Sequence, residues 1–287
     1  MRSGPDSISL PLYIMKKLVM LLLIMPVVAL SQTTFMTFNL RYNNPGDKEN
    51  CWESRKVEIA DMLHRYHPDI LGIQEGLQDQ VLYLDSAMED YSYTGVGRDD
   101  GKTKGEYSAI FYNTNRFELL SMKTYWLSDT PDTVSVGWDA AMERIATFAM
   151  FSDLKKGDTL YVFNTHMDHI GVQARENSAR LILQIIDQQK LWNKRLVVMG
   201  DFNATPQESP VKLFAEKLQC AYNNSRETKQ GPPGTFNAFN TTEPVTKRID
   251  YIFTNKLPVR FYRHIDDRRK NNLWLSDHLP VLIQLND

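Results

Sequence analysis

The stretch Leu196-Val197-Val198-Met199-Gly200-Asp201-Phe202-Asn203-Ala204 joins an apolar run to a group of polar residues. An apolar run of this kind predicts a core strand that is buried on both faces. The polar groups at its C-terminal end lie where sheets usually carry ligand sites. Gly200 lets a ligand approach the backbone, Asp201 offers an anionic oxygen, and Asn203 adds an amide that donates and accepts. Taken alone, the motif is also compatible with an Asx turn.

Further polar groups stand at the boundaries of other apolar runs. Each of them has an ordinary explanation as a helix cap, a turn residue or a solvated histidine. Their repetition, always as an acid, an amide or an imidazole at a strand boundary, favours a single polar cluster. These groups are Asn39 after Thr37-Phe38, Glu75 after Ile70–Gln74, His166 and His169 after Tyr161–Thr165, Asp250 before Tyr251–Phe253, and Asp277-His278 before Leu279-Pro280-Val281.

In this order, the polar segments resemble the endonuclease/exonuclease/phosphatase (DNase I-like) superfamily. Its members include deoxyribonucleases, abasic-site endonucleases, deadenylases, neutral sphingomyelinases and inositol polyphosphate 5-phosphatases. The resemblance runs from Thr33 to Leu285. It is carried by Asn39, Gln74-Glu75, Asn164-Thr165-His166, Gly200-Asp201-Phe202-Asn203, Arg248-Ile249-Asp250-Tyr251 and Ser276-Asp277-His278-Leu279-Pro280-Val281.

The pattern between these motifs predicts an α+β protein with a single domain over residues 32–287. Hydrophobic periodicity predicts helices over 53–66, with Val57, Ala60 and Leu63 inward, and over about 173–192, with Leu181, Ile182, Ile185 and Ile186 inward. Strands are predicted over 107–112, 117–126, 145–151 and 160–164, the last two joined by a hairpin turn at 154–159. The resemblance implies a four-layer αββα sandwich, in which two packed, mainly antiparallel sheets are flanked by helices.

The N-terminal segment predicts export. Met15-Lys16-Lys17 precedes an apolar stretch, Leu18–Leu30, that is short for a membrane span and ends in Ala29-Leu30-Ser31. We expect residues 1–31 to comprise an extension and a Sec-type signal peptide cleaved after Ser31, which places the protein in the periplasm or outside the cell. An uncleaved anchor is the alternative. In an exported chain, Cys51 and Cys220 could form a disulfide or remain as free thiols.

The predicted chemistry is metal-assisted hydrolysis of a phosphoester. Carboxylate and amide oxygens select Mg²⁺, or Mn²⁺, over zinc. Glu75 is the first predicted metal ligand, with Asn39 beside it, and by resemblance Asp277 completes or assists this site. Asp201 is expected to orient and deprotonate the attacking water, and Asn203 to hold a phosphoryl oxygen.

The remaining roles come from the resemblance and from local pattern. By resemblance His278 contacts the phosphate or shares in proton transfer, Asp250 hydrogen-bonds its ring, and His166 donates to the phosphate or protonates the leaving oxygen. Three residues are predicted to bind substrate: Arg144 as a phosphate clamp, His169 if its segment is a loop, and Phe236 as an aromatic surface for a base or sugar.

The sequence indicates the reaction more narrowly than the substrate. With 33 basic and 35 acidic residues the chain has no global field for a polyanion, although nucleic acid is not excluded. Gly-Asp-Phe-Asn-Ala is typical of nucleases and deadenylases, and Val198-Met199 stands where 5-phosphatases carry a Trp. We therefore expect a secreted phosphodiesterase or nuclease acting on nucleic acid or a phospholipid headgroup. The alternatives are a sphingomyelinase-like or phosphoinositide-type phosphatase and a non-catalytic glycan- or lipid-binding module. No obligate protein partner is predicted.

Overall fold

The computed structural model describes Met1, Gly4 and residues 32–286. From Gln32 on, the described residues pack into one compact unit. The predicted signal-peptide segment, residues 15–31, lies outside the described residues. Within the part of the chain that is described, no helix has the length and apolarity needed to cross a membrane.

Two six-stranded sheets form the centre of this unit, with strand orders β11-β12-β1-β2-β4-β3 and β5-β6-β7-β8-β10-β9. Each sheet contains one parallel pair, β1–β2 and β7–β8, and the other pairs are antiparallel. The predicted mainly antiparallel α+β sandwich is therefore confirmed. The strands are β1 Thr34–Asn39, β2 Ile70–Gln74, β3 Tyr91–Thr94, β4 Ile110–Asn113, β5 Phe117–Trp126, β6 Ile145–Asp153, β7 Asp158–His166, β8 Arg195–Asp201, β9 Gln219–Cys220, β10 Asp250–Thr254, β11 Val259–His264 and β12 Val281–Leu285.

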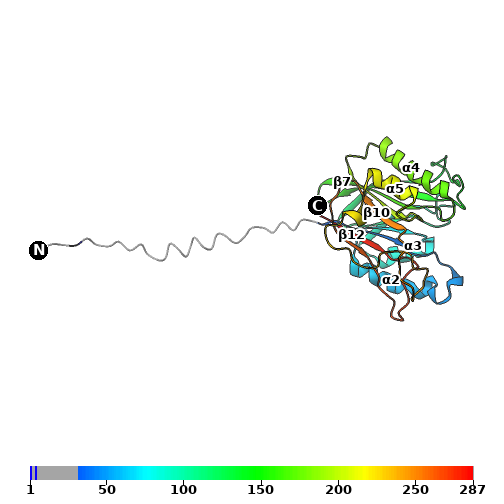
Figure 1. Ribbon diagram of the computed structural model, residues 1–287, viewed down its shortest axis with the longest axis horizontal. Helices are drawn as coiled ribbons and strands as arrows, with labels where there is room; N and C mark the ends of the chain where they lie inside the picture. Colours follow the sequence, from blue (N-terminus) through cyan, green and yellow to red (C-terminus); the bar gives the residue numbers. More distant parts are fainter. Residues whose placement is uncertain (2–3, 5–31, 287) are drawn as a thin grey trace. The chain divides into compact units, whose positions relative to one another are not determined.

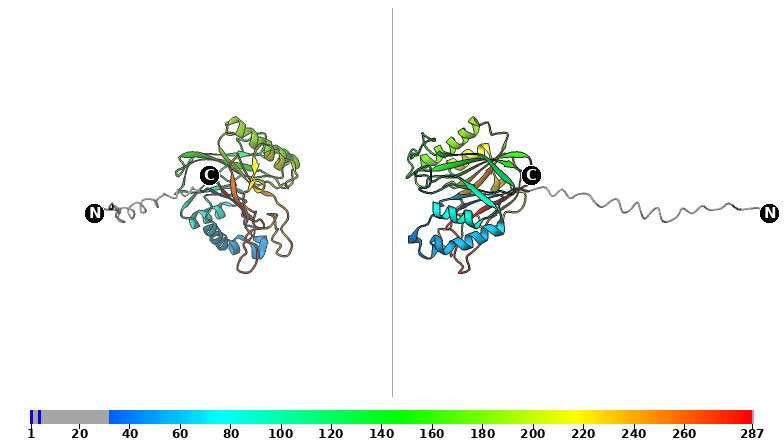
Figure 2. Two further views of the ribbon diagram at one scale, coloured as in Figure 1. Left: turned by 60° about the vertical axis from the view of Figure 1, so that its left-hand side comes forward. Right: turned by 180° about the vertical axis from the view of Figure 1, so that it is seen from behind.

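Helices cover the outer face of each sheet, which gives the four layers seen in Figure 1 and from two further directions in Figure 2. Helices α2 and α3 pack on the first sheet, and α4 and α5 pack on the second. The helical segments are η2 Pro45–Asn50, α2 Trp52–Tyr66, α3 Gln78–Ala87, α4 Val172–Gln188, α5 Ser209–Lys217 and α6 Ala221–Asn224.

Strand β8 shows why its sequence is apolar without interruption. Leu196 and Val198 pack into the cluster under α4 and α5, whereas Val197 and Met199 pack into the cluster between the two sheets. Since side chains alternate along a strand, a strand buried on both faces must be apolar at every position. The predicted core strand is confirmed.

The helix predictions need three corrections. In α2 Ala60 and Leu63 are buried as expected, but Val57 is 57% exposed and Ile59 is buried in its place. The buried face of α2 is therefore rotated from the expected one, and it includes Ile59 and Met62 but not Val57. Helix α4 ends at Gln188 rather than near residue 192, because Lys190 adopts a left-handed conformation with φ 58°. Leu181 is only partly buried against the core.

The strand predictions are mostly confirmed. The turn between β6 and β7 is as expected, with Asp153 paired to Asp158. Strand β4 begins later than predicted, at Ile110, because Tyr107 instead forms isolated bridges to Gly76 and Gly97. Cys51, at the start of α2, and Cys220, in β9, are both free thiols.

The strand register brings the polar ends together. The parallel pair β7–β8 sets His166 beside Asp201, and the antiparallel pair β8–β10 sets Asp250 on the other side of Asp201. Gly200 makes this close approach possible, because with its φ of 143° a Cβ atom there would lie 2.0 Å from the carbonyl oxygen of Thr165.

Candidate active site

Asp201, at the end of β8, is the centre of the polar cluster and is almost fully buried. Its Oδ1 accepts the backbone N–H of Asn203 at 2.8 Å, and its Oδ2 accepts the side-chain amide of Asn39 at 3.0 Å. The Nε2 atoms of His166 and His278 lie 3.6 and 3.7 Å from the same Oδ2. One oxygen of Asp201 thus faces two imidazoles, one at the end of β7 and one just before β12.

Asn39 joins this carboxylate to a second one from the other sheet. The Asn39 amide nitrogen donates at 3.0 Å to Oε1 of Glu75, whose Oε2 accepts the backbone N–H of Tyr42 at 3.1 Å. Oδ1 of Asn39 accepts the backbone N–H of Arg41 at 2.9 Å. In this arrangement Asn39 holds two carboxylates with its nitrogen, so a role as an oxygen ligand to a metal stays a prediction.

Two overlapping groups of three side chains could hold a metal ion, and both contain Asp201. They are Glu75–His166–Asp201 and Asp201–Asp250–His278, with the potential ligand atoms of each group within 4.8 Å of one another. Burial, and then the charge of Asp250, raise the pKa of Asp201 above its usual range. Oδ1 of Asp250 is buried without a hydrogen-bond partner. A small cation would offset this concentration of negative charge, so the residues fit one.

The surroundings of His278 favour its charged form. Its Nδ1 donates to Oδ2 of Asp250 at 2.9 Å. Burial alone would disfavour the charged ring, but the carboxylates of Asp250 and Asp201 outweigh it and raise the pKa of His278 well above the ordinary value. The charged form of this buried ring is therefore favoured next to Asp201.

His166 is held neutral although it lies beside the same carboxylate. Burial, followed by the positive charge of Arg144, lowers the pKa of His166 to about 3. Nη1 of Arg144 lies 3.1 Å from both ring nitrogens, and the Asn203 amide lies 3.2 Å from Nε2. The amide of Asn203 also donates to the carbonyl oxygen of Met167 at 3.0 Å. The two histidines of the cluster thus differ in protonation at neutral pH.

Arg144, predicted as a phosphate clamp, is buried and committed to protein partners. Its Nε donates to Oδ2 of Asp168 at 3.3 Å, Nη1 faces His166, and Nη2 donates to Nδ1 of His169 at 2.8 Å. A direct contact from this guanidinium to a phosphate would have to compete with these bonds. The clamp therefore stays a prediction, while a structural role for Arg144 is directly visible.

The other predicted residues line the opening of the same site. His169 lies in the loop between β7 and α4 and is exposed, as expected if its segment were a loop. Phe236 packs edge-on against His278, with ring centroids 5.1 Å apart, and Lys247 Nζ lies 5.3 Å from its ring centre. Oδ1 of Asp277 accepts the hydroxyl of Ser276 at 3.2 Å.

A cleft of about 560 Å³ connects these groups. Every residue predicted for the site contributes to its wall except Asn39 and Asp250, which lie beneath it as partners of wall residues. Five wall residues were not predicted from the sequence, and of these only Arg41 gave a local signal, since it lies two residues after the polar strand end Asn39. The wall consists of Arg41, Tyr42, Glu75, Arg98, Glu106, Met142, Arg144, His166, His169, Asp201, Asn203, Phe236, Asp277 and His278.

Each of the three arginines in this wall is paired with a carboxylate. Arg41 contacts Asp47 at 2.8 Å and Arg98 contacts Glu106 at 2.7 Å, both with two hydrogen bonds. Arg144 contacts Asp168 at 3.3 Å. The positive charge of the cleft is therefore largely balanced within the protein.

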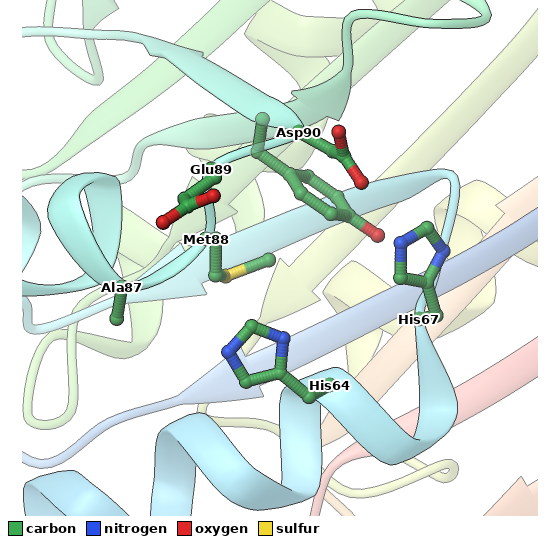
Figure 3. Close-up of a pocket in the computed structure, with 7 residues that line it drawn as sticks. His64, His67, Ala87, Met88, Glu89 and Asp90 are labelled. Carbon is green, nitrogen blue, oxygen red and sulfur yellow. The ribbon is translucent and has the colours of Figure 1, made fainter.

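A second hollow, of about 280 Å³, lies between the end of α2 and the turn before β3 (Figure 3). His64 and His67 come from one side of it, and Glu89 and Asp90 come from the other. It shares no residue with the cleft around Asp201. Among residues 32–286 these side chains do not form a group whose ligand atoms converge on one point.

Comparison with known proteins agrees with this arrangement. Residues 36–278 match the Endonuclease/Exonuclease/phosphatase family. An endonuclease/exonuclease/phosphatase family protein from Bacteroides thetaiotaomicron is similar in structure, with 35% identity, 89% of this chain and 97% of that chain covered, and a TM-score of 0.84. The mannosyl-6-phosphatase of Bacteroides thetaiotaomicron VPI-5482 is 35% identical, with 89% and 100% of the two chains covered and a TM-score of 0.83. The probable RNA exonuclease NGL3 of Saccharomyces cerevisiae is 27% identical over 58% of this chain and 35% of its own length.

Proposed function

Because this chain belongs to the endonuclease/exonuclease/phosphatase family, we propose that it is an exported, divalent-metal-dependent hydrolase of phosphate monoesters carried on carbohydrates. The observation that carries the reaction class is the pair of buried histidines whose Nε2 atoms lie 3.6 and 3.7 Å from the same oxygen of Asp201, with surroundings that shift the pKa of His166 down and the pKa of His278 up. Groups whose environments push their pKa values apart are typical of acid–base sites.

Each side chain has a task in this hydrolysis. Asp201, whose pKa is raised, accepts a proton from the attacking water. His278 places positive charge where negative charge develops on the phosphoryl oxygens, and can return a proton to the leaving oxygen. The Asn203 amide is placed to hold a further phosphoryl oxygen.

Mg²⁺ is the proposed cofactor, with Mn²⁺ as a substitute. Glu75 would hold it, with Asp277 from the neighbouring wall of the cleft, next to Asp201, which serves as the proton acceptor. When bound, such a cation polarises the phosphoryl group and offsets the negative charge around Asp201. Activity that survives in EDTA would contradict this part of the proposal.

The preference for a monoester on a sugar rests on charge and on similarity. A protein that follows a polyanion backbone needs unbalanced positive charge along its cleft, whereas Arg41, Arg98 and Arg144 are each paired with an acid. A single phosphate group needs only the local charge of His278 and a cation. The 35% identity to a mannosyl-6-phosphatase along its whole chain points in the same direction.

Nuclease activity, the leading prediction from the sequence, is the second candidate because of the similarity to a probable RNA exonuclease. The test is a substrate panel with Mg²⁺: mannose 6-phosphate, glucose 6-phosphate, bis-p-nitrophenyl phosphate, single-stranded DNA, RNA and sphingomyelin vesicles. We expect the highest kcat/KM for a hexose 6-phosphate. Faster cleavage of an oligonucleotide or of the lipid would replace the monoester proposal.

Export is proposed on the N-terminal sequence alone, where a basic start precedes Leu18–Leu30 and small residues at Ala29 and Ser31. N-terminal sequencing of protein recovered outside the cytoplasm should give Gln32 as the first residue. Recovery of the unprocessed chain in the membrane fraction would identify an anchor instead.

A further inference from the structure

His169 stands out as an exposed residue of the cleft wall whose ring is hydrogen-bonded by the protein at Nδ1. We propose that Nε2–H of His169 donates to a hydroxyl or ring oxygen of the alcohol leaving group, and that this bond makes the enzyme selective for sugar phosphates. The inference rests on the proposed monoesterase function and adds to it the residue that reads the sugar.

The contact with Arg144 determines which ring nitrogen of His169 carries a proton. A guanidinium has only donors, so the 2.8 Å bond from Nη2 of Arg144 requires Nδ1 of His169 to accept. The proton of the neutral ring must then sit on Nε2. Protonation of Nδ1 would turn the same contact into a repulsion, so Nε2 remains the outward donor.

Arg144 is itself immobilised, which makes the position of His169 definite. Its Nε donates to Asp168, and Asp168 Oδ1 accepts the backbone N–H groups of Ile170 and Gly171 at 2.8 and 2.6 Å. These bonds tie the loop that carries His169 to a buried ion pair. An exposed histidine with such support is preorganised for binding, because less side-chain freedom is lost when a ligand arrives.

From the location of His169 we infer that it contacts the leaving group and not the phosphoryl group. Nη1 of Arg144 faces His166, which lies 3.6 Å from Asp201, whereas Nη2 faces His169. The guanidinium of Arg144 therefore lies between His169 and the histidine that contacts Asp201. It is exposed while His166 is buried, although both line the same cleft. Among residues 32–286 no acceptor for Nε2 of His169 is found, so this donor is available to a ligand.

The experiment compares two substrates that share a phosphate monoester and differ in the leaving group. Mannose 6-phosphate carries hydroxyls, and p-nitrophenyl phosphate has none on its ring. The purified full chain is assayed with Mg²⁺ as wild type, His169→Ala and His169→Gln, with His64→Ala as the matched control. His64 is an exposed histidine in the separate hollow of Figure 3.

We expect His169→Ala to lower the ratio of kcat/KM for mannose 6-phosphate over p-nitrophenyl phosphate by about tenfold, mainly through KM, as for one lost hydrogen bond. His169→Gln, whose amide can donate at a similar reach, should restore at least half of the ratio on a logarithmic scale. His64→Ala should leave the ratio unchanged.

Equal losses on both substrates in His169→Ala, or a His169→Gln ratio as low as that of His169→Ala, would overturn the role of His169 alone. Failure of the wild-type enzyme to release phosphate from either monoester would instead overturn the proposed function. The two failures are therefore distinguishable in the same set of assays.

Discussion

His278 and His166 form a natural comparison, because both are buried and both place Nε2 within 3.7 Å of the same oxygen of Asp201. Their second neighbours differ. A carboxylate, Asp250, contacts His278, and a guanidinium, Arg144, contacts His166. The pKa of His278 is consequently raised, and the pKa of His166 is lowered to about 3. At equal depth, the charge of the second neighbour decides the protonation of a buried histidine.

The largest expected effect comes from changing the group that both rings share. Asp201→Asn keeps the size of the side chain but removes the base, and we expect a loss of about a hundredfold or more in kcat. His278→Ala should cause a loss of similar size, because it removes the buried cation. Both are measured at saturating Mg²⁺, with circular dichroism as the control for folding. Near-wild-type turnover in either variant would remove that residue from the proposed chemistry.

Changing only the second neighbour of His278 should have a smaller effect. In Asp250→Asn the ring loses its closest negative charge, so burial favours the neutral form and the pKa of His278 falls. Activity that needs the imidazolium is then lost at lower pH than in the wild type. We expect about a tenfold loss at neutral pH and an alkaline limb of the pH–rate profile displaced toward acid. An unchanged limb would show that the charge of His278 is not used.

The carboxylate on the opposite sheet tests the metal rather than the histidines. Glu75→Gln removes one anionic oxygen from a hard-cation site while preserving the shape of the side chain. The Mg²⁺ concentration for half-maximal rate should rise by roughly tenfold, with little loss at saturation. A metal titration in the wild type and the variant makes the comparison. An identical midpoint would place the cation away from Glu75.

A third buried histidine, His264 in β11, does not line the cleft and shows the effect of burial on a ring without a charged contact. It has no charged partner in direct contact, since Tyr262 donates its hydroxyl to Nε2 at 2.7 Å and Nδ1 donates to the carbonyl oxygen of Pro232 at 2.7 Å. Burial lowers its pKa to about 4. Because the unfolded ring titrates near 6.5, the unfolded chain binds the extra proton first as the pH falls.

His264 should therefore stabilise the fold fully above pH 6.5 and lose this contribution as the pH falls toward 4. The expected size is about 3 kcal/mol, which thermal or urea unfolding between pH 7.5 and pH 4 would measure. In His264→Asn this part of the pH dependence should be absent while turnover at pH 7.5 is retained. The same acid loss in the variant would assign it to other groups.

The sequence predicted the core of the site because its residues stand at strand ends. Asp201 and Asp250 could be placed together in advance, since strand ends of a packed sheet meet at one edge and their neighbours in register follow. The same reasoning assigned Glu75 and Asn39, which also stand at strand ends, to this polar cluster. Short-range pattern is sufficient wherever the strand itself sets the position of a side chain.

Loop residues could not be predicted in this way. Arg98 and Glu106 reach the cleft only because Tyr107 bridges Gly76 and Gly97, and no periodic pattern indicates that bridge. The opposite pKa shifts of His166 and His278 also could not be predicted, because they depend on the contacts of His166 with Arg144 and of His278 with Asp250 in three dimensions. The end of α4 was missed for a local reason: Lys190 takes a left-handed conformation without the Gly or Asn that usually signals it.

Strand β12 has a consequence for the timing of activity. It is inserted between β11 and β1, so the segment carrying Asp277 and His278 is positioned by pairing with the first strand of the sheet. During synthesis, His278 cannot reach Asp201 until β12 has been translated and has closed this gap. A nascent chain stalled before that point holds an incomplete acid–base set. The proposed acid–base set is therefore complete only after β12 has paired with β1, however early the other strands have formed.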